Sequence, residues 1–225
     1  METLEVLPVR IRITSILRKA IYAGEYKSGD ELSLTDVAAR LGVSRTPVRE
    51  AFQMLESEGL ITLRMNKGAI VNTIDRKFIR DIFEMRILLE SQAAFLAAKN
   101  GMEEETLTKL LERSFSMQDH PDPLDPGEYV ALNQAIHQAV WQAADNHQLT
   151  GYLLELWNGP SVGHGEKAAE HHYQASTGEH ISILQAIRAR QPEAAKQAMV
   201  RHISRSMENM LARYPGTEAT DAGNG

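Results

Sequence analysis

Hydrophobic positions between residues 34 and 61 recur at the spacing of two short helices separated by a tight turn. The residues that repeat at this spacing are Val37, Ala38, Leu41, Val48, Phe52 and Leu55. Gly42 stands where a left-handed residue commonly ends a helix, and Ser44 is a typical N-cap for the next one. The pattern therefore predicts a helix, a turn and a second helix.

The second predicted helix has a polar face on its N-terminal half. After Ser44, this face consists of Arg45, Thr46, Arg49 and Gln53. In helix-turn-helix proteins this part of the helix enters the major groove, where arginine reads guanine or binds a phosphate. The alternative is an ordinary capped helix start whose charged residues are simply solvated.

The following segment favours the DNA-binding interpretation. Two short β-branched runs flank Asn66, Lys67 and Gly68, which is typical of a hairpin tip, here with a positive charge. Such a wing would place Asn66 and Lys67 near the DNA backbone or minor groove. With a leading helix near residues 9–23, the sequence predicts a winged helix-turn-helix domain of three helices and a β-hairpin over residues 1–74.

After Asp75 the pattern is helical, so the whole chain is expected to be mainly α. The predicted helices span about 75–99, 103–118, 127–144, 146–157, 177–190 and 192–213, with breaks at glycine and proline clusters. An antiparallel all-α bundle of about six helices is expected over residues 75–213. Residues 214–225 are expected to form a disordered tail.

Two runs, GDELSLTDVAARLGVSRTPVREAFQMLESEGLI and NKGAIV, closely resemble the DNA-binding domain of the GntR family of bacterial transcription regulators. The remainder resembles the FadR-type subgroup, which has an FCD effector domain. Some relatives carry a base-contacting arginine where this chain has Thr35, so the operator sequence is expected to differ. The candidate DNA-binding residues are Thr35, Ser44, Arg45, Thr46, Arg49, Gln53, Asn66, Lys67 and Gly68.

The net charge of −6 is unevenly distributed. Residues 1–74 carry 10 lysines and arginines against 9 acidic residues, whereas residues 75–225 carry 14 against 21. Local basic patches with little general attraction to nucleic acid suit a sequence-specific regulator. The chain has no cysteine, no signal peptide and no apolar run long enough to cross a membrane, so a cytoplasmic protein without thiolate sites or membrane partners is expected.

Four polar residues share faces with apolar residues in the predicted bundle. They are Asn133 and His137 on one helix, His180 on another and His202 on a third. Imidazoles that converge in a bundle core suit zinc, nickel, copper or iron. Each histidine alone is also consistent with a core residue satisfied by hydrogen bonds. His171 and His172 are expected at the surface.

The FCD resemblance favours a metal site. Metal-binding members carry an aspartate four residues before a histidine and two more histidines on later helices, which implies Asn133, His137, His180 and His202 as ligands of a divalent metal, zinc or nickel. Asparagine offers an oxygen without charge, so the affinity is expected to be lower than with aspartate.

Arg86 is also expected to point inward, and a buried arginine needs an anion. Its partner is either Glu90, four residues later, or the carboxylate of a small organic acid held together with the metal. The second interpretation gives an effector site of Arg86, Asn133, His137, His180 and His202. FCD relatives respond to metabolites of this class.

The expected function is a homodimeric transcription regulator, most simply a repressor of a metabolic operon. Two symmetric recognition helices would match a palindromic double-stranded DNA operator, and a small carboxylate effector would change their arrangement. Two alternatives from other classes are a metal-dependent hydrolase and a DNA-binding protein with no effector.

Overall fold

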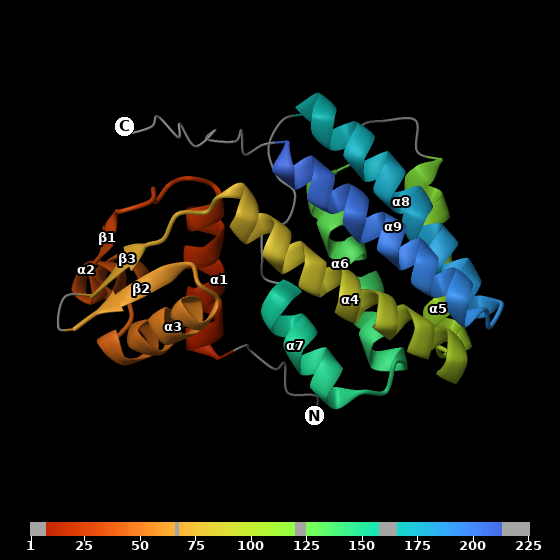
Figure 1. Cartoon of the computed structure of the whole chain (residues 1–225), viewed down its shortest axis with the longest axis horizontal. Coiled ribbons are helices and arrows are strands. Elements are labelled where there is room, and N and C mark those ends of the chain that lie inside the picture. The colour runs from red at the N-terminus through yellow and green to blue at the C-terminus, as the bar shows by residue number, and fades with distance from the viewer. Residues whose placement is uncertain (1–7, 66–67, 120–124, 158–165, 213–225) are drawn as a thin grey trace, which may run out of the picture. The chain divides into compact units, whose positions relative to one another are not determined.

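The computed structural model describes residues 8–65, 68–119, 125–157 and 166–212. These residues divide into two compact units, and the boundary in the chain falls between Asp75 and Arg76 (Figure 1). The predicted Asn66 and Lys67 of the wing tip, the break at residues 158–165 and the tail lie outside the described residues. No helix within the described ranges is long and apolar enough to cross a membrane.

The first unit is a winged helix-turn-helix, as predicted. It contains α1 (Val9–Tyr22), β1 (Glu31–Leu32), α2 (Leu34–Leu41), α3 (Arg45–Ser57), β2 (Ile61–Arg64) and β3 (Gly68–Val71). Ser33 caps α2 by accepting a hydrogen bond from the Asp36 N–H at 3.3 Å, and Gly42 ends it with a left-handed φ of 65°. The side chain of Ser44, by contrast, forms no cap hydrogen bond to α3.

The wing is more than the predicted hairpin, because β1 adds a third strand. The order of the antiparallel sheet is β1-β3-β2, with β3 in the centre. Gly68 is buried at the start of β3 with φ +91°, and a Cβ atom there would lie 2.0 Å from the Leu32 carbonyl oxygen of β1. Glycine is therefore required for β3 to pair with β1.

The described part of the second unit contains six helices, consistent with the predicted bundle. They are α4 (Arg76–Asn100), α5 (Glu104–Gln118), α6 (Pro126–Ala143), α7 (His147–Trp157), α8 (Glu166–Arg188) and α9 (Pro192–Leu211). α4 packs along α9, and α8 lies beside α9 (Figure 1). Leucine and isoleucine side chains of α5, α6 and α8 form a core cluster of Leu107, Leu110, Leu111, Leu132, Ile136, Ile181 and Leu184.

One helix boundary was wrong by more than two turns. The sequence predicts a helix from Thr177, whereas α8 begins at Glu166. Thr177 lies inside the helix, where its hydroxyl donates a hydrogen bond to the Tyr173 carbonyl, four residues earlier, at 2.8 Å instead of capping a helix start. The added turns bring His172 into the bundle.

Candidate functional sites: a recognition face and an imidazole cluster

The N-terminal half of α3 has the exposed polar face that the sequence predicts. Val48, Ala51, Phe52 and Leu55 are fully buried and hold the opposite side of α3 in the core. The exposed residues of the recognition face are Ser44, Arg45, Thr46, Arg49 and Gln53. Within the described part of the chain, neither Arg45 nor Arg49 forms an ion pair, so both guanidinium groups are free to contact DNA.

The other candidate DNA-binding residues have different settings. Thr35 is exposed in the first turn of α2. Gly68 is buried, and its role in the structure is to let β3 approach β1. Of these two residues, only Thr35 has a side chain that is exposed to solvent.

Three histidines from three helices form what we call the imidazole cluster: His137 of α6, His180 of α8 and His202 of α9. Their exposed fractions are 0%, 2% and 3%. The Nε2 atoms lie 3.2 Å apart for His137 and His202, 3.2 Å for His180 and His202, and 3.4 Å for His180 and His137. Each ring therefore presents the same nitrogen to a common centre.

This spacing fits a metal ion. Three nitrogens that each lie about 2.05 Å from a tetrahedral ion are separated by about 3.3 Å. Burial, and then the neighbouring imidazoles, lower the pKa of His180 well below its usual value. Burial also lowers the pKa of His202, to about 4, although Glu179 opposes this. Both rings are neutral at pH 7, the form in which imidazole binds metal.

A buried glutamate fixes the His137 ring. Glu90 is fully buried, and its carboxylate contacts Nδ1 of His137 through Oε2. The other oxygen accepts hydrogen bonds from Arg86, at 2.9 Å from Nε and 2.8 Å from Nη2. Burial alone would raise the pKa of Glu90, but the charges and hydrogen bonds of His137 and Arg86 outweigh it and hold the pKa at about 2. Of the two partners considered for Arg86, the structure pairs it with Glu90.

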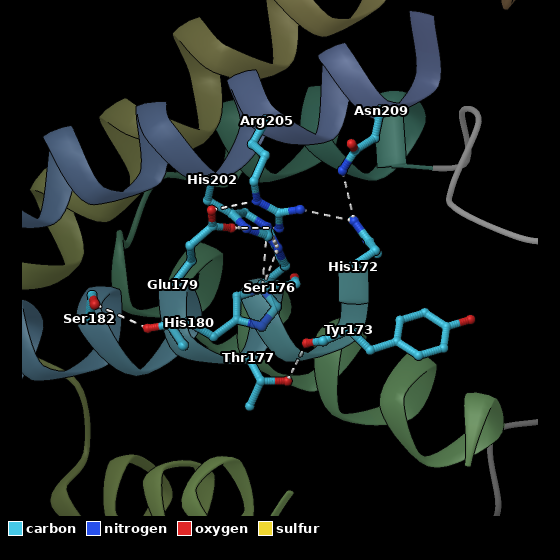
Figure 2. Close-up of polar contacts among 12 residues, drawn as sticks. His172, Tyr173, Ser176, Thr177, Glu179, His180, Ser182, His202, Arg205 and Asn209 are labelled. Carbon is cyan, nitrogen blue, oxygen red and sulfur yellow. Dashed lines mark hydrogen bonds and ion pairs between the residues drawn. The ribbon is translucent and has the colours of Figure 1, made fainter. Parts of the chain in front are cut away.

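A second glutamate has the same relation to His202. Nδ1 of His202 lies 2.9 Å from Oε2 of Glu179, which also accepts a hydrogen bond from Nη2 of Arg205 at 2.7 Å (Figure 2). Burial raises the pKa of Glu179, but the hydrogen bonds from His202 and Arg205 outweigh it, so the pKa is lowered overall. Glu179 is therefore ionised beside the imidazole cluster.

The expectation that His172 lies at the surface was wrong. His172 is 5% exposed, and its Nδ1 accepts hydrogen bonds from Arg205 and Asn209, each at 3.0 Å (Figure 2). The physical reason is that α9 passes over this part of α8 and supplies both donors. His172 is not part of the convergent group of three imidazoles. The side chain of His171 lies outside the described residues.

Asn133 lies one helical turn before His137 on α6 and is partly exposed. Among the described residues, no hydrogen bond joins its side chain to the imidazole cluster. Glu90 and Glu179 were not predicted to belong to the metal site, although their carboxylates contact Nδ1 of His137 and His202. A signal was present for Glu90, since it lies four residues after Arg86 on the inward side of one helix.

Comparison with known proteins gives a family match for each of the two units. The model of the gntR family of bacterial regulatory proteins matches residues 11–71, and the FCD domain model matches residues 81–205. The chain belongs to the GntR family. This GntR-family protein is a DNA-binding transcription regulator whose C-terminal FCD domain is the effector-binding domain.

Relatives of this GntR-family protein cover nearly its whole length. It is 30% identical over 209 residues to the HTH-type transcriptional regulator YdhC of Bacillus subtilis, covering 90% of this chain and 91% of that protein. It is 29% identical to the transcriptional repressor RspR of Escherichia coli, covering 90% and 89%. The solved structure of E. coli McbR/YncC has the same fold, with a TM-score of 0.70 at 19% identity over 93% of this chain and 100% of that one.

Proposed function

We propose that this protein is a homodimeric repressor of a metabolic operon whose DNA binding is controlled by a small organic acid. The acid binds a divalent metal ion, zinc or nickel, in the C-terminal domain. The observation that carries this proposal is the convergence of three buried, mutually close Nε2 atoms. Named relatives support the class of function: one is a gluconate operon repressor of B. subtilis, 33% identical over 66% of this chain.

The proposed metal ligands are His137, His180 and His202, with the carbonyl oxygen of Asn133 as a fourth candidate. Three imidazoles leave a coordination position open, and an ion that also binds Asn133 can expand to five-coordinate to accept one more ligand. An ion bound by neutral ligands keeps its positive charge. An organic carboxylate would occupy the open position and neutralise part of that charge. Because Arg86 already pairs with Glu90, we place the effector's carboxylate at the metal and give Arg86 the role of supporting Glu90.

The proposed DNA-binding domain covers residues 1–74 and the effector and dimerisation domain residues 75–213. Two copies of the recognition face would read the two halves of a palindromic operator. Apolar residues of α4 support dimerisation through this helix, since Met85 and Leu88 are 47% and 62% exposed. The proposed function is repression, without a catalytic activity. Glu90 and Glu179 are both held by arginine and histidine, so neither is well placed to act as the general base of a hydrolase.

A thermal-shift screen of small carboxylates, each with and without zinc or nickel, tests the effector proposal. A true effector is expected to raise the unfolding temperature only when metal is present, because it binds the folded state through the ion. The same acids are then added to the protein on labelled operator DNA, where the effector should change the affinity. Equal stabilisation by an acid with and without metal would contradict a metal-bound effector.

Replacing Asn133 with aspartate is expected to tighten metal binding about tenfold, since a charged oxygen replaces a neutral one at the same position. The measurement is a zinc titration in competition with a chromogenic chelator. Gln134→Glu is the matched control, because it adds the same charge at the next, exposed position of α6. Equal affinities for the wild type and both variants would remove Asn133 from the ligand set.

A further inference from the structure

Two arginine–glutamate–histidine chains approach the imidazole cluster from different sides. One consists of Arg86, Glu90 and His137 and the other of Arg205, Glu179 and His202. In both, the carboxylate contacts Nδ1 of the histidine, and the arginine donates hydrogen bonds to the carboxylate. The glutamates lie on α4 and α8, and the histidines on α6 and α9. The arrangement is therefore repeated with residues from four helices.

A carboxylate that is paired with an arginine acts as a hydrogen-bond acceptor, so Nδ1 of each ring is the donor in its contact with the glutamate. A neutral ring then has its lone pair on Nε2, which is the atom that each ring presents to the other two. The carboxylate also fixes the rotation of the ring and makes Nε2 more basic. Because each arginine contacts its glutamate through two nitrogens, the carboxylate itself has little freedom to turn.

The charge of the site leads to the same conclusion. Imidazole and amide side chains carry no negative charge, so the proposed ligands bring none to a divalent ion. Among the described residues, Glu90 and Glu179 are the carboxylates that contact the cluster, and each is paired with an arginine. Through the Nδ1 hydrogen bonds, they place negative charge one residue away from the ion.

We propose that Glu90 and Glu179 are positioning residues for the metal, which orient His137 and His202 and supply the negative charge that the ligands lack. This inference rests on the proposed metal site. In this arrangement, Arg86 and Arg205 hold the two carboxylates in place. Loss of one glutamate should therefore weaken metal binding even though no ligand is removed.

The test is Glu179→Gln, which keeps the shape of the side chain and removes the charge. Glu179 is preferred to the fully buried Glu90 because it is half-buried, so the variant is more readily accommodated. We expect zinc affinity, measured against a competing chelator, to fall about 10- to 100-fold. The visible absorption spectrum of the Co²⁺-loaded variant should also change, because the ring of His202 is less well fixed.

Glu104→Gln is the matched control. Like Glu179, Glu104 accepts a hydrogen bond from an arginine, here Arg188 of α8 at 3.0 Å. Glu104 is exposed and has no contact with the imidazole cluster among the described residues. It should retain the wild-type zinc affinity and Co²⁺ spectrum. If Glu179→Gln fails to fold, Arg205→Lys serves instead, since it keeps the charge but loses the two-pronged contact, and about a threefold or greater loss of affinity is expected.

The outcomes separate this inference from the proposed function. If the wild-type protein takes up no zinc, the proposed metal site is wrong, and the inference falls with it. If the wild type binds zinc and Glu179→Gln binds it equally well with an unchanged Co²⁺ spectrum, the metal site stands and only the positioning role is overturned. A lower unfolding temperature of the metal-free variant with unchanged zinc affinity would likewise show a purely structural role.

Discussion

Replacing Arg45 and Arg49 together with alanine is expected to abolish specific operator binding while leaving the fold intact. Both side chains are exposed on the recognition face, and neither forms an ion pair among the described residues, so their loss removes no internal contact. A bidentate contact from arginine to guanine contributes about 1–3 kcal/mol of discrimination. Two such contacts correspond to a loss of specific affinity of about 30-fold or more.

The operator is first selected from random DNA with the wild-type protein, and binding of the double variant is then measured by fluorescence anisotropy at several salt concentrations. Arg40→Ala is the matched control, because Arg40 is also exposed but lies at the end of α2 and donates a hydrogen bond to Tyr26. It should lose little specificity. A double variant that still binds the selected operator as tightly as the wild type does, and more tightly than random DNA, would contradict the assignment of α3 to the major groove.

The helix-turn-helix could be predicted because its determinants are local. Val48, Phe52 and Leu55 repeat at helical spacing within a single helix, and Gly42 ends the previous helix by its own left-handed conformation. The strand β1 could not be predicted in the same way. It is two residues long, and it exists because the distant Gly68 allows β3 to approach it. Its pairing partner is more than thirty residues away in the sequence.

The imidazole cluster was partly predictable for a similar reason. Each of His137, His180 and His202 shares a helix face with apolar residues, which is visible in the sequence and indicates burial. That the three rings meet depends on the packing of α6, α8 and α9, which periodicity does not specify. The prediction that the three rings converge came from the resemblance to FCD domains.

The surroundings of the cluster were harder to predict. His172 is buried because Arg205 and Asn209, more than thirty residues later on α9, offer donors to its ring. The polar sequence around it gives no indication of this, and the predicted start of α8 was too late as a result. Glu179 was missed as a partner of His202 for the same reason, since the two lie on different helices. Polar contacts between helices are the part of this site that sequence patterns do not encode.

Replacing His180 with alanine is expected to remove the metal from a folded protein. Wild-type protein purified without chelator should carry about one zinc or nickel ion per chain, and at a free metal concentration 100 times the Kd it should gain about 2.7 kcal/mol of stability. The variant should gain none, because two imidazoles and a neutral amide offer too few strong ligands to a divalent ion.

Elemental analysis and thermal unfolding, with and without added metal, measure both effects. His147→Ala is the control, since His147 is an exposed histidine at the start of α7 and lies outside the group of three convergent imidazoles. The unfolding temperatures of the metal-free wild type and variant are compared separately. This distinguishes the destabilisation caused by the cavity of a removed imidazole from the loss of stabilisation by metal. Full metal content in His180→Ala would mean that the ion is held by other ligands, and the imidazole cluster would then not be the metal site.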